Sequence, residues 1–372
     1  MQVEFRAFQQ GDKQEEHMAI TLSDLLKQVS PDVENEVKRC RDDSRAVIQE
    51  TLRTECRLAM RTQEETRNRE QGAQVPVHLE VGYPVACEKI KFGDDIQQFL
   101  LLGQYRNQLE QISKCTSDLI QIARIITQDD RQMSLFDSEN KKIDEWKHSC
   151  FRLISKEQLI KVFDMDDAVV RSLERTNIWA KRLLKKLNAN DPLRILLSLD
   201  EDILGIYHIR CDYNFPDQRC VNPAVITLYW GMIGLMSQWL GCSIEALTIV
   251  VLTHELAHAY TQLGADIDGR RWAAPDFSSS DRALIEGLAQ YYTDRVLKRL
   301  KARYPDARKA FDKMLKNQSS VYNTHLSWVD EQQEQFSPEV VRRAMLEIRR
   351  QGEKTIMDFE RRLKDARAGL EK

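Results

Sequence analysis

The sequence predicts an α+β fold that is mainly helical, with a small sheet preceding one central helix. Apolar residues recur at helical spacing over long stretches, most clearly in residues 94–127. Three runs typical of strands, residues 193–199, 204–209 and 224–229, come shortly before an uninterrupted apolar run at residues 244–260. That last run is too long for an ordinary strand and indicates a buried helix. The 372 residues suffice for two domains, or for one core with helical extensions.

Residues 1–140 are expected to form a mostly helical N-terminal region. A short strand and a helix around Leu25 come first, and a helix with many charges of both signs follows over residues 30–71. Its sparse apolar residues favour a solvated helix packed along one stripe; the alternative is a coiled-coil segment that contacts a protein partner. A strand is expected at residues 75–81 and a core-facing helix at 94–127. Residues 129–144 are polar and aperiodic, which indicates a boundary.

Residues 145–330 are expected to form the core, and residues 331–372 two C-terminal helices. Helices are predicted from Ser155 and over 166–187, and plain packing is favoured over a DNA-reading helix-turn-helix. The three strands follow, then a helix through Leu240 and the buried helix, for which Ser243 is the expected N-cap. Another helix is predicted over residues 281–303.

Composition excludes several classes of protein. The net charge of −3 argues against a dedicated nucleic-acid binder. The first residues lack the basic start and apolar run of a signal peptide, and no stretch of 18 apolar residues exists, so we expect a cytoplasmic protein without membrane contact. The eight cysteines lack CxxC spacing and are expected to be reduced thiols; a metal pair at Cys211 and Cys220 is the alternative.

The most informative feature is the pentapeptide His254-Glu255-Leu256-Ala257-His258. Residues four apart project from the same face of a helix, so both imidazoles can bind one metal ion. Zinc favours such nitrogen ligands, and in catalytic sites it keeps one position for water. Glu255 would then lie beside that position, as a general base requires.

A second motif, Glu286-Gly287-Leu288-Ala289-Gln290-Tyr291, lies on the next predicted helix. Together the two motifs resemble the gluzincin zinc metallopeptidases, and the resemblance covers about 50 residues, up to Tyr292. It implies a zincin-like core in which Glu286 is the third zinc ligand. Many members carry an aspartate where this chain has Gln290; either Gln290 or Asp294 is expected to orient the first histidine instead.

Two other carboxylates, Asp266 and Asp268, lie closer in sequence to the pentapeptide and could supply the third ligand. The metzincin pattern would need a ligand six residues after His258, where this chain has Gly264. An ordinary Asp/Gly turn explains residues 264–269 better. Glu286 is therefore the favoured ligand.

The resemblance implies a zinc-dependent metallopeptidase, a hydrolase for which an endopeptidase is the favoured form. His254, His258 and Glu286 would hold Zn²⁺, and Glu255 would activate water. A further donor to the oxyanion is expected from His325 or Tyr322, with Tyr291 and Tyr292 as competitors. Residues 226–229 are the candidate edge strand that binds an extended peptide by β-augmentation.

The expected partner is a protein or peptide substrate, and a protein could also bind the charged N-terminal helix. The alternative function is a helical interaction or regulatory protein with a structural or vestigial zinc site. The two hypotheses differ in whether Glu255 is needed.

Overall fold

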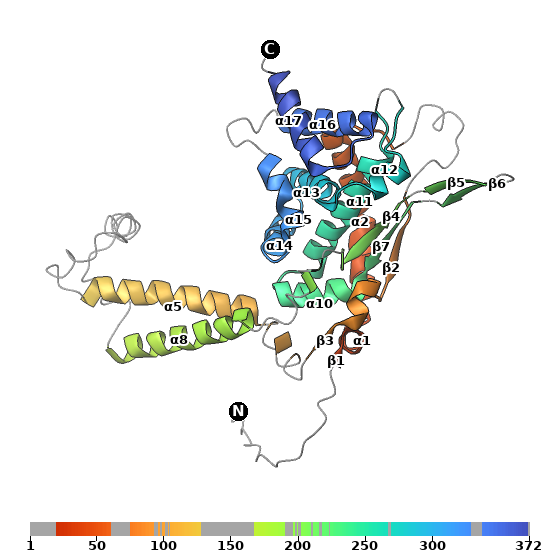
Figure 1. Ribbon diagram of the computed structural model, residues 1–372. Helices are drawn as coiled ribbons and strands as arrows, with labels where there is room; N and C mark the ends of the chain where they lie inside the picture. Colours follow the sequence, from red (N-terminus) through yellow and green to blue (C-terminus); the bar gives the residue numbers. More distant parts are fainter. Residues whose placement is uncertain are drawn as a thin grey trace. The chain divides into compact units, whose positions relative to one another are not determined.

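Figure 1 shows the computed structural model, which is mainly helical with a small sheet, as predicted. Contacts divide the chain into two compact units, residues 99–191 and the remainder. The predicted boundaries near residues 140 and 330 do not coincide with this division. The structure describes residues 20–60, 75–92, 96, 99–100, 103, 105–127, 167–189, 196–197, 199, 202–209, 211–215, 218–222, 224–266, 269–328 and 337–370.

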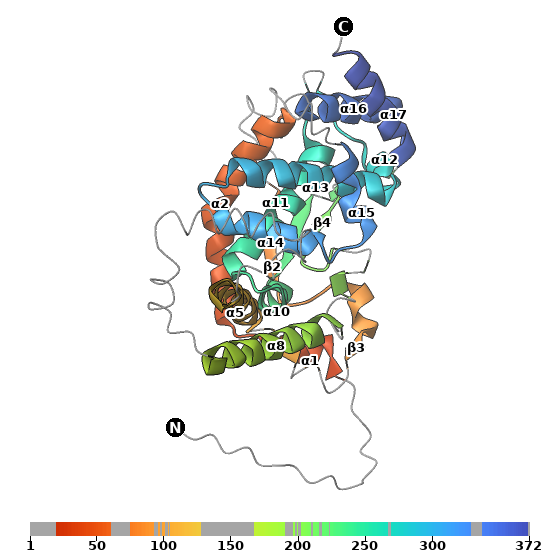
Figure 2. The same cartoon turned by 90° about the vertical axis from the view of Figure 1, so that its left-hand side faces the viewer.

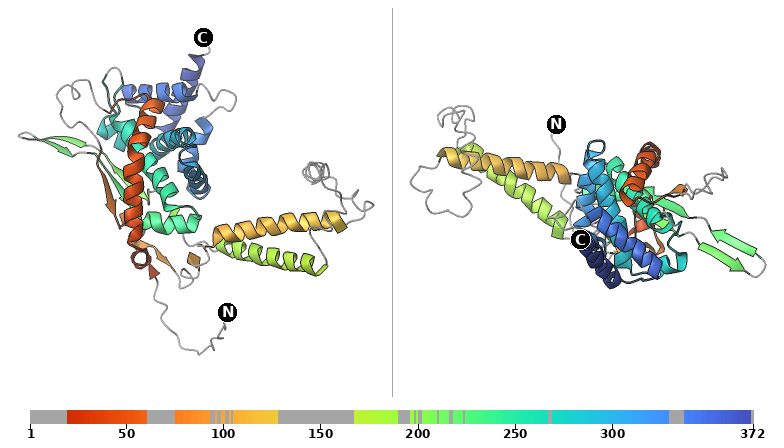
Figure 3. Two further views of the ribbon diagram at one scale, coloured as in Figure 1. Left: turned by 180° about the vertical axis from the view of Figure 1, so that it is seen from behind. Right: turned by 90° about the horizontal axis from the view of Figure 1, so that it is seen from above.

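The smaller unit contains two long helices, α5 (Arg106–Thr127) and α8 (Asp167–Ala189), which lie side by side (Figure 3). The buried amide of Asn177 on α8 donates to the Ser113 carbonyl and to the Thr116 hydroxyl at 2.8 Å, which fixes the register of the pair. The helices predicted over 94–127 and 166–187 are thus confirmed where the structure describes them. The predicted boundary at 129–144 and the helix from Ser155 lie outside the described residues.

Helix α11 (Ile244–Leu263) occupies the middle of the larger unit, and every residue from Ala246 to Leu263 is buried. Helices α2 (Asp32–Cys56), α13 (Arg282–Arg299) and α14 (Pro305–Leu315) pack around it (Figure 2). The buried helix predicted at 244–260 is confirmed. A helix enclosed in this way holds its side chains in fixed positions, as a metal site requires.

Helix α2 shows why the charged N-terminal helix is shorter than predicted. It ends at Cys56, because Arg57 adopts the left-handed conformation (φ 52°) that stops a helix. Its apolar stripe faces α11 and α13, and its buried Glu55 accepts hydrogen bonds from Arg295 and Arg299 of α13 at 2.8 and 2.6 Å. The solvated helix packed along one stripe is the interpretation that the structure matches.

A three-stranded sheet lies beside α11, in the order β2 (Val77–Glu80), β7 (Val225–Tyr229), β4 (Gly205–His208). β2 runs parallel to β7, and β4 runs antiparallel to it. The strands predicted at 75–81, 204–209 and 224–229 are confirmed. The edge-strand assignment of 226–229 is wrong, because β7 is hydrogen-bonded on both sides; β4 is an edge strand among the described residues. Of the strand predicted at 193–199, Leu196 and Leu197 are helical.

The remaining elements complete the larger unit. The hairpin β5–β6 pairs Cys211 with Asn222 and Tyr213 with Cys220. Among the described residues, no helix combines the length and apolarity that a membrane crossing needs. The part of the chain that the structure describes also contains β1 (Ile20–Thr21), α1 (Leu22–Leu26), η1 (Val85–Lys89), β3 (Lys91–Phe92), β5 (Cys211–Phe215), β6 (Gln218–Asn222), α10 (Trp230–Leu240), α12 (Ala274–Ser278), α15 (Ser320–Asn323), η3 (Thr324–Trp328), α16 (Ser337–Gln351) and α17 (Ile356–Ala368).

Ser243 caps α11 as predicted, because its hydroxyl accepts a hydrogen bond from the Ala246 amide at 3.1 Å. Replacing it, as Ser243→Ala, leaves one N-terminal amide without a partner and is expected to lower the free energy of unfolding by about 1 kcal/mol. Urea denaturation monitored by circular dichroism measures the change. Ser243→Gly should cost only a few tenths of a kcal/mol; equal losses in the two variants would contradict the capping role.

Candidate metal centre and catalytic site

The two histidines of the pentapeptide converge on one point. His254 and His258 lie on the same face of α11, one turn apart, and their Nε2 atoms are 3.1 Å from each other. Both side chains are buried. Their ring planes are almost perpendicular, at 87°, so the two rings approach the shared point from different directions.

Glu286 joins them from α13, which packs directly on α11. Its Oε2 lies 3.2 Å from Nε2 of His254 and 3.4 Å from Nε2 of His258. The neighbouring Gly287 is required here: a Cβ at that position would come within 2.5 Å of the Trp328 ring. The glycine therefore lets Trp328 of η3 pack closely against α13 beside Glu286.

A fourth donor, Asp202, was not predicted. It lies three residues before β4, and its carboxylate oxygens are 3.6 Å from Nε2 of His254 and 3.9 Å from Nε2 of His258. Four side chains thus each bring one possible metal-binding atom to the same place, and these atoms all lie within 4.8 Å of one another. The four residues are Asp202, His254, His258 and Glu286.

The donor set suits zinc in both chemistry and spacing. Tetrahedral ligands about 2.1 Å from zinc are about 3.4 Å from one another, and the distances given above from the donors to the two imidazoles run from 3.1 to 3.9 Å. Oε2 of Glu286 is buried without a hydrogen-bond partner. A bound cation would satisfy it and would neutralise the two carboxylates brought together here.

The electrostatics of the cluster also favour a cation. Burial opposes a charged imidazole, but the Asp202 and Glu286 carboxylates outweigh it and hold the pKa of His254 well above its usual value. Burial alone would raise the pKa of Glu286, and the two imidazoles outweigh it and lower that pKa. The site therefore attracts positive charge before any metal binds.

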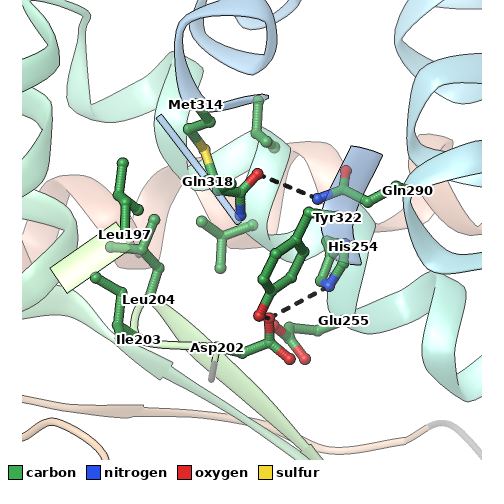
Figure 4. A pocket seen from close by; sticks show the side chains of 13 residues that line it. Leu197, Asp202, Ile203, Leu204, His254, Glu255, Gln290, Met314, Gln318 and Tyr322 are labelled. Carbon is green, nitrogen blue, oxygen red and sulfur yellow. Dashed lines mark hydrogen bonds and ion pairs between the residues drawn. The ribbon is translucent and has the colours of Figure 1, made fainter. Parts of the chain in front are cut away.

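Glu255 lies beside the cluster without belonging to it. It lines a pocket together with His254, Asp202 and Tyr322 (Figure 4), it is 1% exposed, and its Oε2 has no hydrogen-bond partner. Burial, followed by the charge of Asp202, raises the pKa of Glu255 well above the ordinary value. An ionisable group buried without a partner has no structural use, which makes Glu255 a candidate for catalysis.

Strand β4 holds Glu255 from the other side. A Cβ on Gly205 would meet Oε1 of Glu255 at 3.0 Å and Cγ1 of Val251 at 2.9 Å. Only glycine lets the backbone of β4 approach α11 this closely. The same contact fixes where the Glu255 carboxylate can lie.

Of the predicted oxyanion donors, Tyr322 is the one that reaches the site. Its hydroxyl donates to Oδ1 of Asp202 at 2.8 Å and accepts from Arg282 at 3.0 Å. Its ring centroid is 6.3 Å from that of His254. Arg282 also places its Nε 3.7 Å from Oε1 of Glu286. Burial, then the nearby Asp202 carboxylate, raises the pKa of Tyr322 well above the usual value, so the hydroxyl keeps its proton.

The other three candidates lie in different surroundings. Nδ1 of His325 contacts the Tyr322 carbonyl at 3.0 Å, its ring packs against Phe311, and burial lowers its pKa to about 4. Neither contact joins His325 to the cluster, so its catalytic role stays a prediction without support from the geometry. Tyr291 packs edge-on against Tyr292, whose hydroxyl points to Sδ of Met345 at 4.0 Å.

Neither Gln290 nor Asp294 makes the expected hydrogen bond to His254. Gln290 donates to Gln318 at 3.4 Å, while its own Oε1 and Nδ1 of His254 are both buried without partners. Asp294, two helical turns beyond Glu286, instead pairs with Arg308 and with Lys298. The carboxylate of Asp266 pairs with Arg342 at 2.6 Å, away from the cluster, and Asp268 lies outside the described residues.

Sequence reasoning missed Asp202 and Arg282. Arg282 stands four residues before Glu286 and therefore shares its helix face, a signal that was available. Asp202 carries no such signal, since it lies 52 positions before His254 in a segment without a motif.

Comparison with known proteins adds no relative: no protein-family model, no curated protein and no solved structure matches the chain.

Proposed function

We propose that this chain is a zinc-dependent metallopeptidase in which His254, His258 and Glu286 hold the metal and Glu255 is the general base. The observation that carries the proposal is Glu255 itself, buried and unpartnered at the wall of a pocket that also exposes His254. The resemblance of the two motifs to gluzincins supports the same assignment. A zincin-like core agrees with a small sheet ahead of the motif helix.

Each side chain then has a defined task. A zinc ion bound here would polarise the scissile carbonyl and lower the pKa of water from about 15.7 to about 7. Glu255 takes the proton from that water and passes it to the departing amine. Tyr322, whose hydroxyl keeps its proton, is the donor placed to stabilise the oxyanion, and Arg282 orients it.

The pocket indicates the class of substrate. Much of its wall is apolar, formed by Leu197, Ile203, Leu204, Val250, Val251 and Met314. We propose that an apolar side chain of an extended peptide packs against this wall. Strand β4 follows Leu204 directly and is hydrogen-bonded on one side among the described strands, so a peptide could pair with its other edge.

Metal analysis combined with cleavage profiling tests this proposal. We expect one zinc per chain, and cleavage of a peptide library beside apolar residues that stops on chelation and returns with zinc. Binding of no zinc by the folded protein would reject the proposal. Zinc binding without cleavage of any peptide would favour the alternative below. The assignment to the cytoplasm remains part of the proposal; the unpaired buried thiols of Cys40 and Cys56 suit a reducing compartment.

The alternative is an interaction protein with a structural zinc site. Asp202 favours it, because a fourth protein ligand completes the closed tetrahedral arrangement typical of structural zinc. A structural zinc site does not explain why Glu255 is buried without a partner, or why Gly205 of β4 lies so close to Glu255. A structural site predicts that replacing Glu255 changes no activity.

Gly205→Ala tests the contact between β4 and the general base. The added methyl group would press on Glu255 and Val251, so we expect a loss of about 1–3 kcal/mol in the free energy of unfolding. Peptide cleavage should fall through kcat more than through KM, because the base is displaced while the metal ligands stay in place. Gly269→Ala tests a glycine with open space around it, though at a positive φ of 72°. It should lose stability without any fall in kcat; equal losses of kcat in both variants would contradict the assignment.

A further inference from the structure

The Asp202 carboxylate faces both imidazoles, with oxygens 3.6 Å from Nε2 of His254 and 3.9 Å from Nε2 of His258. A zinc ion held by His254, His258 and Glu286 would keep one position for water, and Asp202 lies at the ligand spacing that would let it take that position. We propose that Asp202 is a fourth ligand that closes the metal centre of the resting protein, so that substrate hydrolysis requires its displacement. This inference rests on the proposed function.

Two side chains hold the carboxylate in that position. Tyr322 donates its hydroxyl proton to Oδ1 of Asp202, and Arg282 donates to the oxygen of the same hydroxyl. Figure 4 shows Tyr322, Asp202 and His254 close together at the pocket wall. Arg282 also lies against Glu286, with Nε 3.7 Å from Oε1. One guanidinium therefore contacts Glu286 directly and reaches Asp202 through the Tyr322 hydroxyl. The oxyanion donor is thereby engaged by Asp202 whenever the site is closed.

Asp202 differs from the other ligands in how firmly it is anchored. The side chains of His254, His258 and Glu286 are 5–9% exposed and come from two packed helices. The Asp202 side chain is 18% exposed and comes from a segment outside any helix or strand. Moving it disturbs no helix, whereas moving any of the other three would.

The position of Asp202 along the chain suggests what displaces it. Two residues separate it from Gly205, the first residue of β4, and Ile203 and Leu204 between them line the apolar pocket. A peptide that pairs with β4 and packs against this apolar wall would push on the segment that carries Asp202. Release of the carboxylate would free the fourth position for water and the Tyr322 hydroxyl for the oxyanion.

Metal affinity gives a test that does not depend on activity. Zinc affinity, measured by competition with a chromogenic chelator, should fall about 10- to 100-fold in Asp202→Asn. The visible spectrum of the Co²⁺-loaded protein should change as water replaces a carboxylate. Tyr322→Phe, which keeps the packing and removes one hydroxyl, should show a smaller change in the same direction. Asp306→Asn, an exposed acid on α14, is the matched control and should match wild type.

Access to the fourth position gives a second test. Acetohydroxamate needs an open coordination site, so it should bind the Co²⁺ form of Asp202→Asn at least about tenfold more tightly than wild type. Equal hydroxamate binding, or unchanged zinc affinity and Co²⁺ spectrum in a variant that circular dichroism shows to be folded, would overturn the proposal. If Asp202→Asn behaves as expected while Glu255→Gln leaves peptide cleavage unchanged, the closing ligand stands and the hydrolase proposal fails.

Discussion

Glu255→Gln is expected to lower peptide cleavage by about 10²- to 10⁴-fold, because an amide cannot accept the proton of the attacking water. The substitution preserves size and shape, so the pocket wall and the contact with Gly205 should survive. Zinc content should be unchanged, since Glu255 is not among the metal-ligand candidates. Initial rates on a peptide identified by cleavage profiling, together with zinc analysis, measure both effects.

The matched control is Glu245→Gln, on the same helix. Glu245 lies in the first turn of α11 and is exposed, so its substitution removes a charge without touching the pocket. Cleavage by Glu245→Gln should remain at the wild-type rate. If Glu255→Gln also cleaved at that rate, Glu255 would not be the base and the alternative of a structural zinc site would gain.

The convergence of the proposed metal ligands could be predicted because the sequence signals for them are local. His254 and His258 are fixed by helical geometry alone, and an uninterrupted apolar sequence shows that their helix is buried. Glu286 needed one further step, a resemblance between motifs, and α13 does bring it to the two imidazoles. In each case a short range of sequence contains the whole signal.

The parts that sequence reasoning missed depend on contacts between distant segments. Strand order cannot be deduced from three short runs, and β7 proved to be central because β2, about 150 residues earlier, pairs with it. Asp202 enters the site from an irregular segment, whose path follows from packing and not from periodicity. His325 was chosen for its residue type, yet its ring is buried against Phe311, a position that one sequence does not reveal.

Zinc is expected to stabilise the folded protein strongly. The unfolded chain has no preformed site, so binding contributes about 2.7 kcal/mol when free zinc is 100 times the dissociation constant and about 4.1 kcal/mol at 1,000 times. Adding zinc to chelator-treated protein should therefore raise the midpoint of urea denaturation. The gain should persist in Glu255→Gln, which keeps every ligand.

His258→Ala is expected to abolish most of this gain, because it removes a ligand that lies within 3.9 Å of each of the other three donors. Comparing each variant with and without zinc cancels whatever the substitution costs the metal-free fold. His208→Ala, an exposed histidine on β4, is the matched control and should keep the full gain. A zinc-dependent shift of wild-type size in His258→Ala would place the metal elsewhere. In that case no bound cation would neutralise the carboxylates of Asp202 and Glu286. The physical reason for these two acidic side chains to lie together would then be lost.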